Sequence, residues 1–497
     1  MGEFLIALDQ GTSSSRCIVF DKFGSLHFME QSEISSSYPK EGWVEQDPLE
    51  LWEKQKHCLE LVTRKINAHS PDEGIACGLT NQRETIILWN KDTSEPVYPA
   101  IVWQDCRTSD YCLELKQKGL SKWVQKKTGL PIDPYFSATK IRWILKNIKT
   151  CKKLLKEGKL LCGTVDSWLI WKFTNGAYHV TDPSNASRTL LFNLETQEWD
   201  HELLELFEIP STILPIITNS DCQIPLKDYP FDLFAILGDQ QASLFGNQCF
   251  SKYDTKCTFG TGCFQLMNNG DEIIQSQHGL LNTVAWKIEN KINYALEGAI
   301  FSGGSTIKWL RDEMHFFDKT KECEGLAKKV KDSEGCILIP AFNGLGAPYW
   351  DPNARGLIHG LTTGTNSAHI TRAALWSISL QVYDLIKTFE KEVGKNIGNF
   401  KVDGGASKNK LLMEFQASLL NIPIQVAQHT ELTGWGVASL AGFKRGLFKS
   451  LDEIKSIDLG YRDLRSFENK EVQKMKLLWK KAIPKALKWL PFESAHE

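Results

Sequence analysis

The run from Phe4 to Asp21 holds the side chains of this sequence that are best suited to binding an anion. Two apolar segments, residues 4–8 and 18–20, predict a pair of strands with a tight turn between them. Backbone N–H groups and hydroxyls in such a turn can converge on an anion, and a guanidinium adds planar donors that suit phosphate. The side chains expected there are those of Thr12, Ser13, Ser14 and Arg16.

Asp9 ends the first of these strands. A carboxylate beside a phosphate would repel it unless a metal lay between them, and Mg²⁺ takes one or two carboxylates together with phosphate oxygens and water. The local prediction is therefore a hairpin that binds phosphate and Mg²⁺. It is not a Gly-rich strand-to-helix loop, because neither GxGxxG nor GxxxxGK[ST] occurs here. On these residues alone, a serine-rich turn without a ligand remains the alternative.

Composition limits the class of protein. A chain of 497 residues predicts at least two domains, which we place at residues 1–248 and 249–497 because a strand–turn–strand pattern restarts near residue 250. A net charge of −2 and the absence of long charged blocks do not favour a nucleic acid or a membrane surface as partner. The 13 scattered cysteines without CxxC predict reduced thiols, and no signal peptide or 18-residue apolar run is evident. We expect a cytoplasmic protein.

Two further polar clusters follow apolar segments. Arg83 and Glu84 come after the strand expected at residues 75–79 and offer donors and an acceptor suited to a polyol, although a solvated turn is the simpler reading. Asp239 stands between an apolar run and a helical pattern, where it either accepts a proton or caps the helix. Trp103 closes another strand, and Tyr135 precedes a helix near residue 137, where it either enters a cleft or packs against that helix.

The remaining pattern predicts the elements that position these side chains. We expect helices at 49–66, 108–127, 163–174, 366–391 and 409–420, and a strand pair within 182–193. Residues 257–268 repeat the strand–turn–strand arrangement with a Gly-Thr-Gly turn, which suggests an old duplication and a second phosphate-binding turn. Residues 471–492 predict a docking helix with a solvated lysine face, interrupted at Pro484. Together these elements predict two α/β domains that face a central cleft and transfer a phosphoryl group.

At this point the chain resembles the FGGY family of carbohydrate kinases and, within it, the members that phosphorylate glycerol. The resemblance runs from about Leu5 to Leu447 and rests on long segments: ALDQGTSSSR, GWVEQDP, TNQRET, AIVWQ, YFSATKIRW, DSWLIW, NASRTLLFN, GDQQASLFG, FGTGCF, LGAPYWDP and VDGGASKN. It implies two actin-like (ribonuclease H-like) domains, ATP and Mg²⁺ as cofactors, and sn-glycerol 3-phosphate as product. A homo-oligomer, dimer or tetramer, is also implied.

The resemblance also implies roles for individual residues. Asp239 is the catalytic base and, with Asp9, lies on the metal side. The polyol is bound by Arg83, Glu84, Trp103, Tyr135, Asp239, Gln240 and Phe264. The nucleotide is bound by Thr12, Ser13, Ser14, Arg16, Thr261, Gly304, Lys308, Gly405 and Asn409.

Four departures from the family pattern are visible. Lys308 stands where glutamine is common, and Trp376 and Trp435 replace smaller residues, which we interpret as packing changes. The segment between Cys222 and Phe234 lacks the Gly-Gly-Lys-Gly-Gly loop through which some bacterial relatives bind fructose 1,6-bisphosphate, so we expect no such inhibition. Two alternatives stay open: a kinase for another small polyol or a pentulose, and a catalytically silent scaffold on the same fold.

Overall fold

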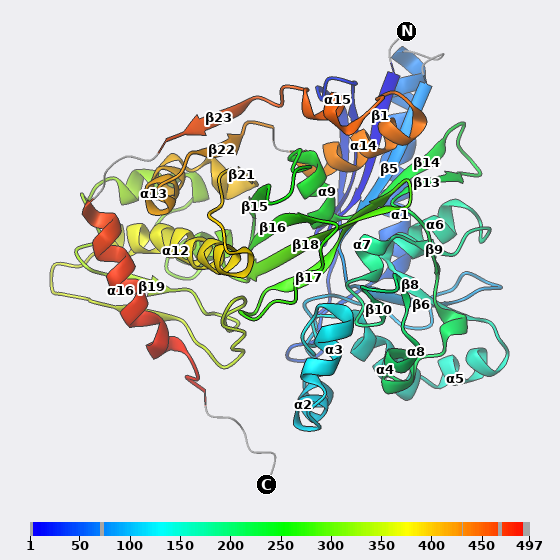
Figure 1. Ribbon diagram of the computed structural model, residues 1–497, viewed down its shortest axis with the longest axis horizontal. Coiled ribbons are helices and arrows are strands. Elements are labelled where there is room, and N and C mark those ends of the chain that lie inside the picture. Colours follow the sequence, from blue (N-terminus) through cyan, green and yellow to red (C-terminus); the bar gives the residue numbers. More distant parts are fainter. Residues whose placement is uncertain (1–2, 70–73, 430, 466–469, 491–497) are drawn as a thin grey trace.

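The computed structural model describes residues 3–69, 74–429, 431–465 and 470–490, and shows an α/β protein built on two large sheets (Figure 1). The first sheet has the strand order β13-β14-β5-β1-β2-β3. Its central strand β1 pairs antiparallel with β2 and parallel with β5, which pairs parallel with β14. These strands are β1 (Glu3–Gln10), β2 (Ser14–Phe20), β3 (Leu26–Glu33), β5 (Gly74–Asn81), β13 (Asp221–Pro225) and β14 (Asp232–Gly238).

The second sheet repeats this topology. Its order is β17-β18-β16-β15-β21-β22-β23, with β15 antiparallel to β16 and parallel to β21, which pairs parallel with β22. The echo between the two Gly-Thr turns in the sequence is therefore matched by two sheets whose central strands share one connectivity, although their edge strands differ. The strands are β15 (Thr255–Phe259), β16 (Cys263–Gly270), β17 (Leu281–Ile288), β18 (Lys291–Ile300), β21 (Phe400–Asp403), β22 (Ile424–Ala427) and β23 (Tyr461–Leu464).

Smaller elements complete the first half of the chain. A four-stranded sheet has the order β4-β7-β6-β8. Its strands are β4 (Glu45–Gln46), β6 (Ile86–Asn90), β7 (Ala100–Ile101) and β8 (Leu160–Thr164), and two-residue strands are β9 (Val180–Thr181), β10 (Phe192–Asn193), β11 (Glu198–Trp199) and β12 (Ile216–Ile217). The helices are α1 (Pro48–His69), α2 (Ser109–Gln117), α3 (Ser121–Thr128), α4 (Ser137–Asn147), α5 (Lys149–Lys156), α6 (Val165–Phe173), α7 (Pro183–Ala186), α8 (His201–Leu206) and α9 (Asp239–Gly246).

The second half contains seven α-helices among the described residues, of which α12 is the longest. They are α10 (Gly304–Asp312), α11 (Cys323–Ala327), α12 (Ser367–Val393), α13 (Lys410–Leu420), α14 (Leu432–Arg445), α15 (Leu451–Lys455) and α16 (Lys470–Ala486). A two-stranded sheet joins β19 (Ile337–Ile339) to β20 (Leu357–His359), and short 3₁₀ turns lie at Ser211–Ile213, Thr320–Glu322 and Gly405–Lys408. In the described residues no helix is long and apolar enough to span a membrane.

Strand β1 is apolar almost throughout because helices cover both of its faces. Leu5 and Ala7 belong to the cluster that contains α14, whereas Ile6 and Leu8 belong to the cluster that contains α1 and α6. A strand buried on both faces has a nearly continuous apolar sequence, and this explains why β1 could be predicted from the sequence. Helix α14, from residues 432–445, therefore packs on the first sheet, beside β1 and β5 in Figure 1.

Two glycines let α14 cross α9 at very short range. A Cβ atom built on Gly436 would lie 1.9 Å from the carbonyl oxygen of Ala242, and one built on Gly246 would lie 1.9 Å from that of Leu432. Both obstacles are backbone atoms, so neither helix can yield by rotating a side chain. The crossing depends on the absence of side chains at these two positions.

The substitution Gly436→Ala is therefore expected to destabilise the protein by about 1–3 kcal/mol or more, because it forces the two helices apart. The midpoint of thermal unfolding would measure this effect. Gly325→Ala is the matched control, since Gly325 lies in helix α11 and an added Cβ meets nothing within 4 Å. Equal melting temperatures for the two variants would contradict the packing argument.

Most of the expected helices are present, but three sequence-based expectations need correction. The strand pair within 182–193 is wrong: Asp182 caps a short helix that begins at Pro183, and only residues 192–193 form a strand. An Asp N-cap followed by Pro at the first helical position favours helix over strand. The helix expected at 108–127 is two helices, separated around Gly119, which has a φ of 77°.

The C-terminal helix docks as expected. Val472, Met475 and Trp479 of α16 are buried in the core of the second half. The expected interruption at Pro484 is wrong, because α16 continues through Pro484 to Ala486. A proline removes one helical hydrogen bond, and here it does so in the last turn.

The two unusual tryptophans have packing roles, as the sequence suggested. The ring of Trp376 stacks on Phe415 with centroids 3.8 Å apart, and its indole N–H donates to Glu471 at 2.9 Å. Trp435 on α14 is fully buried, with its ring centroid 5.7 Å from that of Phe20. Both therefore belong to the hydrophobic core.

Candidate active site

Three neighbouring strands of the first sheet end at the same edge and carry the principal site residues. Asp9 lies opposite Thr80 near the end of β1, Arg83 follows β5, and Asp239 follows β14, whose Gly238 lies opposite Asn81. Because these three strands are parallel, their carboxyl ends meet where open sheets place their ligands. The separate polar clusters of the sequence thus form one site.

Arg83 and Asp239 make direct contact. Arg83 Nε lies 3.2 Å from Asp239 Oδ1, and the Arg83 side chain is 2% exposed while that of Asp239 is 32% exposed. Helix α9 has Gly238 at its N-cap position, and Asp239 Oδ1 accepts the N–H of Gln240 in the first turn at 2.7 Å. A helix-stabilising role of Asp239 therefore stays open beside the catalytic one. The Asp239 carboxylate is thus accessible and oriented by a buried guanidinium.

Glu84 is held by a residue that the sequence reasoning did not single out. Arg188 Nε donates to Glu84 Oε1 at 2.6 Å, and both side chains are almost fully buried. Glu84 has a φ of 63°, a left-handed conformation that non-glycine residues adopt at a cost and that is frequent at functional sites. The alternative of a solvated turn for Arg83 and Glu84 is therefore excluded.

Two more missed residues come from the second sheet and one from α9. Glu297 on β18 accepts hydrogen bonds from Arg83, and Gln241 Oε1 accepts another from Arg83 Nη1 at 3.2 Å. Lys256 on β15 donates to Gln240 Oε1 at 2.7 Å. A charged residue within the apolar stretch of β18 was the available signal for Glu297, because such residues are rarely buried without a partner. Lys256 lies in β15 beside a threonine and gave no comparable signal.

The charges around Asp239 act in opposite directions. Burial raises the pKa of the Asp239 carboxyl above its usual value, the cations Arg83 and Lys256 oppose this rise, and the carboxylate of Asp9 adds to it. Burial also lowers the pKa of Lys256. A carboxylate with a raised pKa is a stronger proton acceptor, which suits a general base.

Three aromatic rings adjoin this cluster. The ring centroids of Trp103 and Tyr135 are 5.6 Å apart, and those of Trp103 and Phe264 are 6.4 Å apart, both edge to face. Tyr135 is buried, and the buried Lys140 donates to its carbonyl oxygen at 2.7 Å. Residues from both halves of the chain thus form one apolar wall.

Hydrogen bonds connect this wall to the N-terminal hairpin. The indole N–H of Trp103 donates to Thr12 Oγ1 at 3.0 Å. Gln46 Nε2 donates to the Thr12 carbonyl at 2.6 Å, and Gln82 Nε2 donates to Gln46 Oε1 at 2.9 Å. Both glutamines are buried, so the position of Thr12 is fixed relative to the residues that follow β5.

The hairpin has the expected form. Gly11 N–H donates to the Ser14 carbonyl at 2.9 Å, Ser13 is exposed, and Ser14 is buried. Arg16 donates to Glu431 Oε2 at 2.8 Å and has its Nε 3.6 Å from Asp9 Oδ2. Burial raises the pKa of the Asp9 carboxyl, and the guanidinium of Arg16 opposes this rise.

The second sheet brings together part of the expected nucleotide site. Gly304 N–H donates to the Gly260 carbonyl at 2.9 Å, and Ser305 N–H donates to that of Thr261 at 3.0 Å. A Cβ on Gly304 would lie 2.7 Å from Gly260 O and 4.0 Å from the Cβ of Ala406, the neighbour of Gly405. The glycine-rich turns therefore approach one another closely, and only glycine fits at residue 304.

Two members of the expected nucleotide set lie further along these elements. Asn409 Oδ1 accepts from Leu412 N–H at 3.0 Å and caps α13. Lys308 is exposed on α10, one turn after Gly304. The cap gives Asn409 a structural role of its own, and the nucleotide-binding roles of both residues stay predictions.

The carboxylates present fit a magnesium ion better than a fully protein-bound metal. Within the described residues no group of three or more His, Cys, Asp or Glu side chains could hold a metal. Asp9 and Asp239 supply two carboxylates, and Mg²⁺ commonly takes one or two, with phosphate and water completing its octahedron. The residues therefore fit an ion that arrives with a phosphate ligand.

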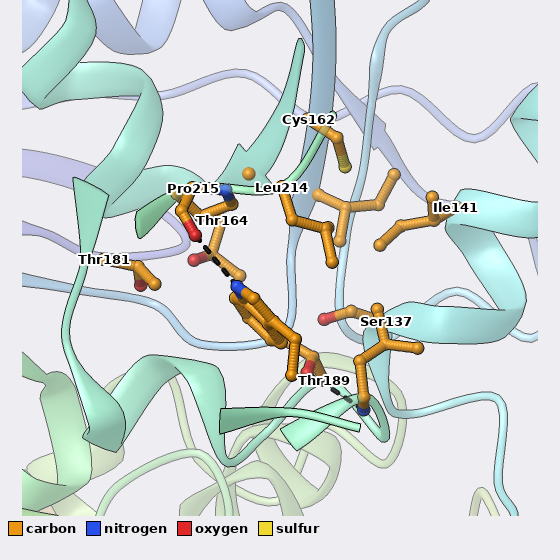
Figure 2. A pocket seen from close by; sticks show the side chains of 12 residues that line it. Ser137, Ile141, Cys162, Thr164, Thr181, Thr189, Leu214 and Pro215 are labelled. Carbon is orange, nitrogen blue, oxygen red and sulfur yellow. Dashed lines mark hydrogen bonds between the residues drawn. The ribbon is translucent and has the colours of Figure 1, made fainter. Parts of the chain in front are cut away.

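A small cavity lies elsewhere in the first half of the chain. Figure 2 shows Ser137, Ile141, Thr164 and Thr181 around this space, which has a volume of about 10 Å³. That volume is just enough for one water molecule. It is too small for a polyol.

Comparisons with known proteins agree with this geometry. Models of the N-terminal and C-terminal domains of the FGGY family of carbohydrate kinases match residues 4–246 and 255–444. The chain is 46% identical over 498 residues to the glycerol kinase of Alkaliphilus oremlandii, covering 98% of each protein. It is 48% identical over 495 residues to that of Paraburkholderia phytofirmans, covering 98% of this chain and 99% of the relative.

Solved structures show the same fold. The glycerol kinase of Plasmodium falciparum with ADP superposes with a TM-score of 0.90 at 32% identity, and 98% of each chain is covered. A xylulose kinase from Lactobacillus acidophilus superposes with a TM-score of 0.85 at 23% identity, covering 97% of each chain. The two sheets of like connectivity, the site at their adjoining ends and the matches along the whole chain lead to one conclusion: this chain belongs to the FGGY family of carbohydrate kinases.

Proposed function

We propose that this chain transfers the γ-phosphoryl group of ATP to glycerol and yields sn-glycerol 3-phosphate. The observation that carries the proposal is the accessible Asp239 carboxylate, held by Arg83 at 3.2 Å beside an aromatic wall. Relatives that are 46–48% identical over 98% of the chain are named glycerol kinases, which supports the choice of substrate. The related structure named as a complex with ADP supports an adenine nucleotide.

Recognition of glycerol is assigned to both polar and apolar groups. In the proposal Arg83 donates to a hydroxyl, and Glu84 accepts from one. Tyr135 and Gln240 complete the polar contacts, and Trp103 with Phe264 covers the carbon face. Three rings in contact leave little room for a longer sugar, which favours a small triol over a pentulose.

In phosphoryl transfer the protein contributes mainly the positioning of the reactants and electrostatic stabilisation, and little covalent chemistry. In the proposal Asp239 takes the proton of the attacking hydroxyl, and the nucleotide phosphates lie against Thr12, Ser13, Ser14 and Arg16. Mg²⁺, held on the side of Asp9 and Asp239, would neutralise charge on the transferred group when it is bound with ATP. Exclusion of water by the two domains would prevent hydrolysis.

The nucleotide site on the second sheet is part of the same proposal. Thr261, Gly304 and Gly405 would let backbone approach the nucleotide closely, with Asn409 and Lys308 further along. The proposal also includes a cytoplasmic location, to which 13 cysteines without a disulfide are suited. It includes a homo-oligomer of two or four chains, which light scattering on purified protein would measure.

The decisive experiment measures ATP-dependent phosphorylation of glycerol, xylulose and ribulose, singly and in competition. We expect glycerol to have the highest kcat/KM, by at least about tenfold, a ratio that requires only about 1.4 kcal/mol. A higher kcat/KM for a pentulose would show that the proposed substrate is wrong and would leave the proposed phosphoryl transfer in place. ATP binding without turnover of any polyol would instead support a silent scaffold.

A further inference from the structure

The polyol-binding arginine of the first domain is held by a carboxylate of the second. Arg83 Nη1 donates to Glu297 Oε2 at 2.6 Å, and Arg83 Nη2 donates to Glu297 Oε1 at 2.9 Å. Two parallel bonds between a guanidinium and a carboxylate fix direction as well as distance. The contact joins the loop after β5 to strand β18, residues 214 positions apart.

Glu297 is a fully buried carboxylate that two arginines neutralise. Its side chain is 0% exposed, and the residues directly opposite it on the neighbouring strands are Leu266 and Leu281. A carboxylate among leucines is costly unless it is paired. Arg83 and Arg188 are its partners, and they lower the pKa of the Glu297 carboxyl to about 2 although burial acts in the opposite direction.

Arg83 also contacts Asp239, the carboxylate that reacts in the proposed function. Its Nη atoms face Glu297, whereas its Nε faces Asp239 Oδ1 at 3.2 Å. One guanidinium thus bridges a carboxylate of each sheet. If Glu297 lost its charge, the guanidinium would keep Asp239 and the more distant Glu84 as its carboxylate partners and would be free to turn towards Asp239.

We propose that Glu297 is a positioning residue that fixes the guanidinium of Arg83, so that the polyol site of the first domain is complete only when the second domain supplies this carboxylate. The inference rests on the proposed function, because it assigns Arg83 and Asp239 their roles in that reaction. The inference goes beyond the proposed function, because it makes substrate recognition depend on Glu297, a residue assigned to neither the polyol site nor the nucleotide site.

The test compares Glu297→Gln with the wild type in the full-length protein. We expect KM for glycerol to rise by roughly 10- to 100-fold, the range seen when the outer partner that orients a metal-binding residue is removed. The dissociation constant of ATP should change less than about threefold, because Glu297 contacts none of the phosphate hairpin. A general loosening of the fold would instead weaken glycerol and ATP together.

The pH profile gives a second readout. The charged groups that face Asp239 are Arg83 from the β5 loop, Lys256 from β15 and Asp9 from β1. Removing the charge of Glu297 leaves Arg83 less neutralised, so Arg83 favours the ionised form of Asp239 more strongly. The acid limb of the kcat/KM profile should therefore move to lower pH by roughly half a unit to one unit.

Two further variants keep the result interpretable. Glu297→Asp retains the charge but has a shorter side chain. It should therefore raise KM for glycerol and leave the acid limb of the kcat/KM profile in place. This variant also tests the inference if Glu297→Gln does not fold. Asp384→Asn is the control, because Asp384 is another carboxylate of the second half, bonded to Tyr349 and Trp479 away from the site. It should leave both readouts unchanged.

Unchanged KM for glycerol and an unchanged pH profile in Glu297→Gln would overturn the inference. An equal loss of glycerol and ATP affinity would also overturn it, since that result indicates a structural role only. A wild type that does not turn over glycerol would remove the proposed function, and this inference with it. Failure of the inference alone is thus distinguishable from failure of the function.

Discussion

Replacing Asp239 by asparagine is expected to lower kcat for glycerol phosphorylation by about 10²- to 10⁴-fold, the range contributed by a positioned general base. Asparagine has the same size and can still accept from Arg83 Nε, so the site should keep its shape. It cannot take the proton of the attacking hydroxyl at neutral pH. Steady-state kinetics should therefore show a loss in kcat with a smaller change in KM for glycerol.

Asp312→Asn is the matched control for this variant. Asp312 lies on the surface, where it pairs with Arg311, so it should retain wild-type kcat. ATP binding by Asp239→Asn, measured by calorimetry, should stay close to that of the wild type if the fold is intact. A fully active Asp239→Asn would assign the proton transfer to another group.

The second large effect concerns stability. Replacing Arg188 by methionine is expected to lower the free energy of unfolding by about 3–5 kcal/mol, because removing one partner of a buried ion pair leaves a carboxylate uncompensated. Arg188 is fully buried and bonds both Glu84 at 2.6 Å and Glu297 at 3.1 Å. After its removal the ion-pair partner left to Glu84 among the described residues would be Arg83, whose Nε is 3.9 Å away.

Urea denaturation followed by tryptophan fluorescence would measure this loss. Arg311→Met removes an arginine of a surface pair with Asp312 and should cost less than about 1 kcal/mol. A loss for Arg188→Met no larger than that of the control would show that the buried ion network does not hold this region together. Both variants are measured at neutral pH, so that the substitution is the one difference between the two experiments.

Local patterns were enough to find the parts of the site that lie next to regular elements. Asp9 and Asp239 follow apolar runs that become buried strands, and the change from apolar to polar marks the strand end directly. Arg83 and Glu84 were visible for the same reason, but the sequence could not exclude a solvated turn. That decision needed the partners Arg188 and Glu297, which lie 104 and 214 positions away.

Those partners could not be read from the sequence because tertiary packing selects them. Arg188 lies in a segment whose apolar flanks, residues 190–192, favoured a strand, whereas the Asp182 cap turned its beginning into a helix. Glu297 is one charged position in the apolar stretch of β18, a pattern that reveals a buried charge without naming its partner.

The packing of α14 was equally hidden. Helix α14 was not among the helices expected from the sequence, and nothing local indicates which sheet it covers. The close crossing with α9 becomes meaningful only when Gly246 and Gly436 are placed together. The division of the chain at residue 248 stays a prediction, and a helix from beyond that point lies on the first sheet.

The position of α14 has a consequence for biosynthesis. A chain grows from its N-terminus, and domains generally fold as they emerge. The first sheet, however, receives the cover of one face only from residues 432–445, near the end of translation. Until then Leu5, Ala7 and their neighbours lack the apolar cover of α14, and exposed apolar surface of this kind makes a partly synthesised chain prone to aggregation.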